Sequence, residues 1–408
     1  MHLRRATTAG VLAMATAAAG LIGISSAPMA SADGIGKVWS WGSAASPAFT
    51  VPAEAQKDVQ AIEVGGGHVL AMKDFGIIAW GANADGQATV PAEATSNVLS
   101  FSAGADFSLA IKKIDDFTGK VLAWGANGKG QTTVPEAALT RVSEVAAGGG
   151  HALAIRDIDD TNMGVVIGWG DNAAGQTTIP SAAQSGVTAI AAGGQHSLAL
   201  QAGAVIAWGS NAANQTAVPA AAGSGVTAIA AGDTFSAALA GGKVIVWGGS
   251  AAVQAVPTEA QSNIVAIAAG GGNIAAVTSG GSVIAWGDSA NVAAVPDAAK
   301  TSISAVGVGS DVAFAISQAV PPETVRELKA KALKGGAQVS WLPPMAIQGA
   351  VLVGYQVKVN KGAWKSYGSE VNSVKLTGLG KKKTVTIRVR AVSYAGPGMP
   401  EMVKVTTK

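Results

Sequence analysis

Short apolar runs bounded by Gly, Asn, Pro and Ser recur along most of this chain of 408 residues. In one stretch the runs are GVTAIAAG (186–193), QHSLALQ (195–201) and GAVIAWG (203–209), which are β-branched or alternating. Such runs are typical of strands, and no helical periodicity separates them. The link LQAGAV between the last two runs is short and contains Gly, which favours a hairpin.

A Trp-Gly pair ends one strand of each such stretch and recurs at a nearly constant period. It stands at seven positions: Trp41, Trp80, Trp124, Trp169, Trp208, Trp247 and Trp286. The steps between them are 39, 44, 45, 39, 39 and 39 residues, and the glycine of a second block, typically AAG, follows each Trp after 23 or 24 residues. Three strands in each unit of roughly 40 residues, without helices, predict the blades of a β-propeller.

The two ends of the repeat region are incomplete in complementary ways. The segment VWSWG (38–42) lacks a preceding hairpin strand, and VAFAIS (312–317) lacks a following Trp-Gly strand. Pairing these two segments would complete a blade and remove the exposed strand edges of an open array. The sequence therefore predicts an all-β fold in which residues 33–317 form a closed seven-bladed β-propeller with about three strands per blade.

Residues 1–32 have the pattern of a secretory signal peptide. Two arginines precede an apolar stretch that ends at Ile24, and the segment ASA at 30–32 forms a small-x-small cleavage site. An uncleaved membrane anchor is the alternative, because the apolar stretch approaches the ~20 residues that span a bilayer. We expect a secreted, extracellular protein with no membrane segment after cleavage. Since the sequence contains no cysteine, a disulfide scaffold is excluded.

The composition changes after Ser317, where a linker is expected at 318–322. Residues 323–408 contain a further set of strand-like runs: 325–333, 336–342, 351–360, 373–379, 383–393 and 402–407. With Trp341 in VSWLPP and Tyr355 in GYQVKV, this segment resembles a fibronectin type III domain, which implies a seven-stranded β-sandwich. The tyrosine that is usual in that family two residues before IRVR is Val385 here.

The repeated blocks VIAWGxNxxGQTTVP and AAGxxHSLAL resemble the regulator of chromosome condensation superfamily, and within it the secreted β-lactamase inhibitory protein II type. That resemblance implies a face that grips an enzyme through aromatic residues at the two positions after AAG and in the loop after Trp-Gly. None of these positions is aromatic in this chain. Binding energy concentrates in aromatic and Arg anchors. The resemblance therefore implies the propeller fold for this chain, but the residues of the inhibitory surface are largely missing.

The partner-binding candidates lie at or beside these positions of the repeats. They are Asp106, Phe107, Lys129, Gln195, Asp233, Thr234, Phe235 and Asp311. The two phenylalanines are the nearest aromatic remnants, and they stand where other repeats have His68, His151 and His196. Equivalent positions in different repeats lie on a ring, whereas metal ligands must converge, so these histidines are interpreted as structural.

No catalytic constellation is recognisable, and repeated glutamines and prolines are interpreted as turn-fixing residues. The two longer hairpins, 111–121 and 155–166, carry possible calcium ligands: Asp115, Asp116, Asp157, Asp159, Asp160 and Asn162. Neither hairpin has the calcium-loop pattern or its closing Glu, so solvated hairpin tips are favoured. We expect no enzymatic activity, no metal and no cofactor.

Charge divides the chain sharply. Residues 33–319 hold 11 Lys and Arg against 21 Asp and Glu, whereas residues 320–408 hold 15 against 4. Strand alternation points apolar residues of the second region inward and cations outward. The expected polyanion-binding residues are Lys358, Arg388, Arg390 and Lys404, with Lys381, Lys382 and Lys383 at the edge. An ordinary solvated face is the alternative; the ligands would be anionic wall polymers such as teichoic acids.

Together these features predict a secreted, monomeric, non-enzymatic binding protein that is tethered near an anionic surface by its basic domain. The expected propeller partner is an exported protein, with β-lactamases or penicillin-binding proteins as the lead from resemblance. A carbohydrate-binding accessory or a cryptic polysaccharide-degrading protein is the alternative, because fibronectin type III domains accompany secreted polysaccharide hydrolases. We expect no nucleic-acid partner.

Overall fold

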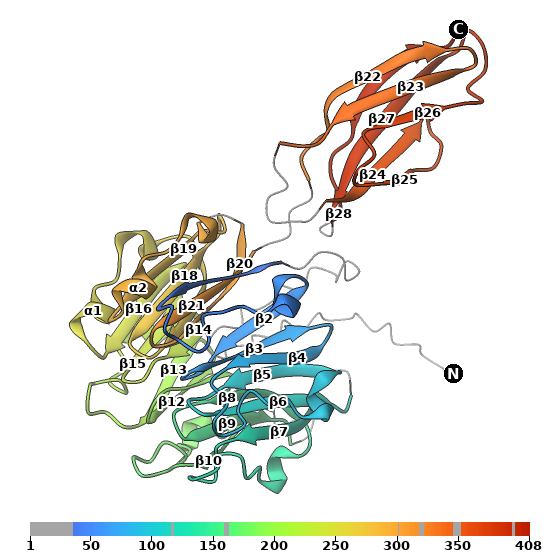
Figure 1. Ribbon diagram of the computed structural model, residues 1–408. Coiled ribbons are helices and arrows are strands. Elements are labelled where there is room, and N and C mark those ends of the chain that lie inside the picture. The colour runs from blue at the N-terminus through green and yellow to red at the C-terminus, as the bar shows by residue number, and fades with distance from the viewer. Residues whose placement is uncertain are drawn as a thin grey trace, which may run out of the picture. The chain divides into compact units, whose positions relative to one another are not determined.

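The computed structural model describes residues 36–115, 118–158, 163–300, 302–317, 322–345, 352–393 and 396–408, to which all structural statements below refer (Figure 1). The expected signal peptide at 1–32 and most of the expected linker lie outside these residues. The chain divides into two compact units. One contains Trp39–Ala55 and Gln60–Ile316, and the other contains Ser317–Lys408. In the described residues, no helix has the length and apolar character needed to cross a membrane.

The N-terminal unit consists of short antiparallel strands in groups of three. The strands are β1 (Val38–Gly42), β2 (Val59–Val64), β3 (His68–Lys73), β4 (Gly76–Gly81), β5 (Val98–Ala103), β6 (Phe107–Lys113), β7 (Gly119–Gly125), β8 (Val142–Ala147), β9 (His151–Arg156), β10 (Val165–Gly170), β11 (Val187–Ala192), β12 (His196–Gln201), β13 (Ala204–Gly209), β14 (Val226–Ala231), β15 (Phe235–Ala240), β16 (Lys243–Gly248), β17 (Ile264–Gly270), β18 (Asn273–Thr278), β19 (Val283–Gly287), β20 (Ile303–Val308) and β21 (Val312–Ser317). The only helices described are single turns, among them α1 (Ala251–Gln254) and α2 (Ala290–Ala293).

Most groups contain three consecutive strands, such as β2-β3-β4 and β11-β12-β13. The groups β5-β6-β7 and β8-β9-β10 are joined by one residue pair, Gly119 with Val142, at their longer hairpins. The remaining group has the order β1-β21-β20, so the predicted pairing of 38–42 with 312–317 is observed. The first and last strands of the repeat region therefore share one sheet.

The apolar core of this unit lies between successive groups. In one cluster, Leu153 and Ile155 of β9 pack with Ile190 of β11 and Trp208 of β13. Strand β12 is buried at all but its last residue, because both faces of its sheet are covered. Alanines let neighbouring sheets approach closely, while each fully buried Leu or Ile contributes about 1.5–3 kcal/mol.

The repeated Trp and Gln residues fasten one group to the next. The indole N–H of Trp169 donates to the carbonyl of Gln131 in the preceding group, over 2.9 Å. The side-chain Oε1 of Gln131 accepts from the backbone N–H of Lys129, over 2.8 Å, and closes the turn. The same arrangement occurs at Gln87, Gln176 and Gln215, which confirms that these glutamines fix turns.

The C-terminal unit consists of two antiparallel sheets. One has the order β22 (Arg326–Leu333), β23 (Gly336–Leu342) and β26 (Ser373–Leu376); the other comprises β25 (Lys365–Gly368), β24 (Leu352–Val359) and β27 (Thr384–Ser393), with β28 (Gly396–Pro397) and β29 (Glu401–Thr406) also paired to β27. Trp341 and Tyr355 meet edge to face in the core, with ring centroids 5.3 Å apart. The short polar strand β25 was not expected from the sequence.

Candidate binding surfaces

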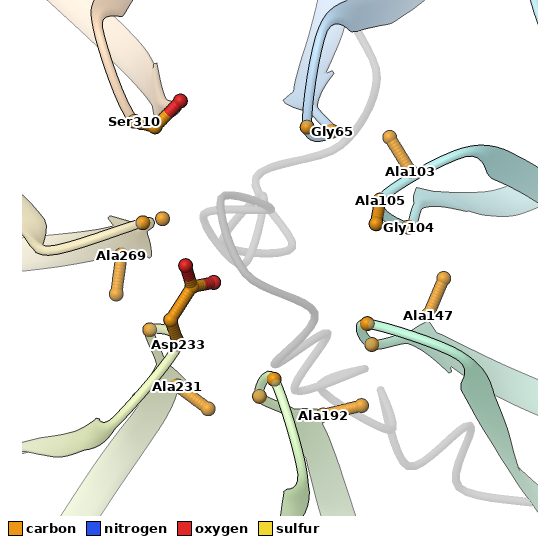
Figure 2. A pocket seen from close by; sticks show the side chains of 18 of the residues that line it. Gly65, Ala103, Gly104, Ala105, Ala147, Ala192, Ala231, Asp233, Ala269 and Ser310 are labelled. Carbon is orange, nitrogen blue, oxygen red and sulfur yellow. The ribbon is translucent and has the colours of Figure 1, made fainter. Parts of the chain in front are cut away.

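A central pocket of the N-terminal unit has a volume of about 160 Å³. Its lining repeats the AAG block: Val64–Gly66, Ala103–Ala105, Ala147–Gly149, Ala192–Gly194, Ala231–Asp233, Ala269–Gly271 and Ser310. Figure 2 shows these segments converging on a common centre, with the side chains of Asp233 and Ser310 pointing into it. The repeated block therefore builds the pocket wall from backbone and small side chains.

Backbone hydrogen bonds link successive groups around this pocket. The N–H of Gly66 donates to the carbonyl of Gly104 over 3.2 Å, and the N–H of Gly149 donates to that of Gly193 over 3.1 Å. A Cβ at Gly65 would lie 2.2 Å from the carbonyl oxygen of Gly104, closer than any real Cβ. The glycine of AAG is thus required by the close approach of neighbouring groups.

We call the two residues after each AAG-type block the rim. They are Gly66, Gly67, Ala105, Asp106, Gly149, Gly150, Gly194, Gln195, Asp233, Thr234, Gly271, Gly272, Ser310 and Asp311. In most repeats the carbonyl of the second rim residue accepts a hydrogen bond from the backbone N–H of the residue that follows Trp-Gly, as Asp106 does from Ala126 and Gln195 from Ser210. Of the predicted residues, Asp233 lines the pocket, and Asp106, Gln195, Thr234 and Asp311 each follow directly on a residue that lines it.

Lys129 also reaches the rim, although it lies in the loop after Trp-Gly. Its Cγ is 3.6 Å from where a Cβ at Gly150 would stand, and Lys129 is exposed. The carboxylate of Asp171 is close to the same point. Lys129 therefore lies beside the rim residue Gly150.

The prediction that Phe107 and Phe235 belong to a partner-binding face is wrong. Both are completely buried, because they begin strands whose first side chain points between two groups. A Cβ at Gly104 would lie 2.3 Å from the ring of Phe107, and one at Gly232 would lie 2.0 Å from Phe235. These rings cover the glycine of their own AAG block, and a partner could not reach them.

The three histidines at the same position form a buried link between groups. Nε2 of His68 lies 2.9 Å from Oγ of Ser108 in the next group, and that hydroxyl donates to the carbonyl of Gln87 over 2.8 Å. Since the serine uses its proton there, it accepts a hydrogen bond from Nε2–H of the histidine. Burial lowers the pKa of His68 to about 4. The predicted structural role is supported by this geometry.

The residue at this position is matched by a residue of the next group: a histidine is paired with a serine, and a phenylalanine is paired with an apolar residue. His151 pairs with Ser197 over 3.0 Å, and His196 pairs with Ser236 over 3.0 Å. After Phe107 the equivalent residue of the next group is Ala152, and after Phe235 it is Ile274. Polar residues therefore face polar residues between neighbouring groups, and apolar residues face apolar ones.

The rim is acidic beyond the residues predicted from the sequence. Asp171 and Asp288, which follow Trp-Gly, lie against the rim glycines Gly150 and Gly272. Partial burial raises the pKa of Asp233 at the mouth of the pocket. The signal for the two missed aspartates was their place directly after Trp-Gly, where the chain meets the rim.

The second candidate surface is the outer face of the sheet that contains β24 and β27. Val385, Ile387 and Val389 of β27 are buried as predicted, while Arg388 and Arg390 point outward and are half-buried. Lys404 is exposed on β29, and Lys381, Lys382 and Lys383 are exposed before β27. Strand pairing places Lys358 directly opposite Arg388 and Thr386 opposite Lys404. The structure therefore gathers Lys358, Arg388, Arg390 and Lys404 on one sheet face, while the other three predicted lysines precede β27 in the chain.

Trp364, which the sequence reasoning missed, belongs to the same face. The guanidinium carbon of Arg390 lies 4.1 Å from the centroid of its ring, and Nζ of Lys358 lies 5.5 Å from it. Nε and Nη2 of Arg390 also donate to Oε1 of Gln356, over 2.9 and 2.7 Å. Partial burial lowers the pKa of Arg390. The available signal was an aromatic residue between lysines in KGAWK.

The hairpin aspartates bind their own turns. Asp115 accepts from the N–H and the hydroxyl of Thr118, and Asp157 accepts from the N–H of Gly164. Asp116, Asp159, Asp160 and Asn162 lie outside the described residues. Within the described ranges, no three His, Asp or Glu side chains are close enough to hold one metal ion.

Comparison with known proteins identifies a similar fold but does not assign the chain to a family. No family model and no curated protein matches the chain. The crystal structure of human WBSCR16, a regulator of chromosome condensation-like protein, is similar with a TM-score of 0.53 and 19% identity over 69% of this chain and 99% of that one. The CRINKLY WD40 ectodomain of the Arabidopsis thaliana receptor kinase ACR4 gives a TM-score of 0.48 and 17% identity, over 62% and 90%. With the repeated three-stranded sheets, the first similarity shows a repeat propeller fold.

Proposed function

We propose that this chain is an exported, non-enzymatic binding protein. Its propeller would receive a partner protein on the rim, and its basic C-terminal unit would hold it near anionic wall polymers. The observation that carries the proposal is that the first rim residue of every repeat lines the central pocket, with the second rim residue next to it in the chain. Loops that vary on a rigid scaffold are where binding residues concentrate.

The proposal includes the finer architecture expected from the sequence. The strands from Val38 to Ser317 fall into groups that suit seven blades, with β1 closing the ring beside β21. We also assign the C-terminal unit as a fibronectin type III sandwich. The buried Trp341 and Tyr355, and the neighbouring strands β24, β27 and β29, support that assignment.

The partner is expected to present a basic surface to the rim. Asp106, Asp233 and Asp311 stand there with Asp171 and Asp288, whereas Lys129 is the basic side chain that we find among them. No aromatic or Arg anchor accompanies these carboxylates in the described part of the rim. Binding would therefore depend on complementary charge, which affects the association rate and its salt dependence most.

A binding assay with purified class A β-lactamases and penicillin-binding proteins tests the proposed partner. We expect a complex that the double variant Asp106→Asn/Asp311→Asn weakens about tenfold at low salt, since charged contacts are worth about 1 kcal/mol or more when partly desolvated. Asp58→Asn/Asp74→Asn removes the same charge away from the rim and should leave binding unchanged. No binding at micromolar protein would exclude these enzymes as partners, and equal effects of both variants would exclude the rim.

A retention assay tests the tether. Cell-wall retention of the full chain should fall as salt rises, because exposed charge interactions are screened within about 10 Å at 0.1 M salt. Retention that does not change with salt would contradict the tether.

A further inference from the structure

The outer face of the sheet around β27 carries cations in regular rows. One row across the strands contains Gln356 and Arg390, and the next contains Lys358 opposite Arg388 and then Met402. Lys404 stands one row further on, opposite Thr386. Residues that share this outward phase on the described parts of β24, β27 and β29 include no Asp or Glu. A ligand with one negative charge in each row would meet no carboxylate.

Arg390 is held in place before any ligand arrives. Two of its nitrogens donate to Oε1 of Gln356, and its guanidinium carbon lies over the ring of Trp364. Nη1 and one hydrogen of Nη2 have no acceptor among the described residues. A guanidinium that is ordered in this way offers its free N–H groups to an oxyanion with less loss of rotamer entropy.

We propose that this face binds an unbranched polyol phosphate, a polymer whose phosphodiester groups are joined by short polyol units. This inference rests on the proposed tether and names its ligand. Trp364 and Gln356 are positioning residues that orient Arg390 and Lys358. Arg390, Arg388 and Lys404 contact successive phosphates along the strand direction.

The spacing of the cations supports a phosphodiester repeat. Arg388 and Arg390 are two residues apart on one strand, so their Cα atoms are about 7 Å apart along it. An extended peptide covers about 3.5 Å with three backbone bonds, so a polymer with six bonds between phosphorus atoms repeats about every 7 Å. A glycerol phosphate chain has that number of bonds. Successive phosphates can therefore meet successive cations without a change of register.

The state of Trp364 argues against ligands that stack on aromatic rings. Single-stranded nucleic acids share the six-bond repeat, but their binding proteins supply free aromatic faces for the bases. Here Arg390 lies over the ring of Trp364, and Lys358 is also close to it. No other aromatic side chain shares the outward phase of the described strands. The face thus suits a backbone of phosphates that carries no bases.

Titration of the full-length protein with three polymers of equal charge number tests this inference: an oligo(glycerol phosphate), an oligothymidylate and an oligogalacturonate. We expect the glycerol phosphate to bind at least about fivefold more tightly than the other two. Trp364→Leu should weaken its binding about three- to fivefold without changing the salt slope, because it removes a cation–π contact but no charge. Arg390→Gln removes one phosphate contact. It should therefore make the slope of log binding constant against log salt concentration shallower by about 0.7–0.9.

The variant Lys331→Gln/Lys375→Gln is the matched control, since it removes two exposed charges from the other sheet and should change neither affinity nor slope. Thermal unfolding checks the fold of Trp364→Leu, and Trp364→Phe, which keeps a ring, should bind with intermediate affinity. Equal affinity for all three polymers would overturn the phosphate assignment and leave the tether standing. Failure to bind any of them at low salt would overturn both, and unchanged binding by Trp364→Leu would overturn the positioning role.

Discussion

The two units of this protein use β-sheets in different ways. In the N-terminal unit the sheets are covered on both faces, so strands such as β12 are apolar or small throughout, and polar residues gather where strands end. In the C-terminal unit each sheet is covered on one face, so β27 alternates between buried Val or Ile and outward Thr or Arg. The binding residues that we propose therefore lie where strands end in one unit and along the strands in the other.

This difference also separates the two units chemically. All three described histidines are buried in the N-terminal unit, while residues 323–408 contain none. The acidic excess lies with the first unit, and the basic excess lies with the second. The stability of the first unit should thus depend on pH and on the space between its groups. The stability and polymer binding of the second unit should depend on its surface charge.

The largest expected effect is loss of stability of the N-terminal unit in acid. Burial lowers the pKa of His68, His151 and His196 to about 4, from about 6.5. Between these pH values the unfolded chain binds more protons, so stability falls as pH falls from 6.5 to 4, by up to about 3 kcal/mol for each histidine. Thermal unfolding of the full chain at pH 7 and pH 4.5 measures this loss.

The repeats themselves supply the control for the acid experiment. His68→Phe/Ser108→Ala copies the pairing of Phe107 with Ala152, and it should remove about one third of the histidine-dependent loss. Glu63 acts in the opposite direction. Burial raises its pKa, so the folded chain takes up a proton at higher pH than the unfolded chain, and this group makes the fold more stable as pH falls. The difference between variant and parent isolates the histidine. An unchanged pH dependence in the variant would contradict the assignment.

An effect of intermediate size on stability is expected when one methyl group is added where two neighbouring groups of strands are in close contact. Gly193→Ala would place a Cβ 2.5 Å from the carbonyl oxygen of Gly232 and 2.2 Å from the ring of His196. We expect a loss of about 2–3 kcal/mol in the free energy of unfolding, the upper part of the range of about 1–3 kcal/mol for overpacked sites. Gly128→Ala, where nothing lies within 4 Å, is the control and should change stability by less than about 0.5 kcal/mol. Equal melting temperatures for both variants would contradict the close-approach argument.

The smallest effect is expected on the basic sheet face. Arg388 stands directly opposite Lys358, and like charges in that position are destabilising. Arg388→Gln should raise the unfolding free energy of the C-terminal unit by about 0.5 kcal/mol while it weakens polymer binding. Lys375→Gln, opposite Gln338, should leave stability unchanged. A loss of stability in Arg388→Gln would show that the cations do not repel each other.

Local pattern was sufficient for most strands but not for the position of several side chains. The alternation in 384–393 correctly gave the buried face of β27, because period two needs no knowledge of the partner strand. Strand β25 was missed, since KSYG is short and polar and forms a strand by pairing with β24. Phe107 was misplaced because local sequence does not show that its ring is buried between its own group and the next, against residues of β8 and β9.

The sequence by itself determined the repeat, its period, the complementary ends and the opposite charges of the two regions. These properties depend on the order of residues along the chain, which local spacing and composition preserve. Only the tertiary structure decided that His68 meets Ser108, that Asp171 and Asp288 join the rim, and that Trp364 lies against Arg390. Each of those contacts joins residues from different strands or groups. Their partners follow from the packing of sheets and strand register, which no single stretch of sequence contains.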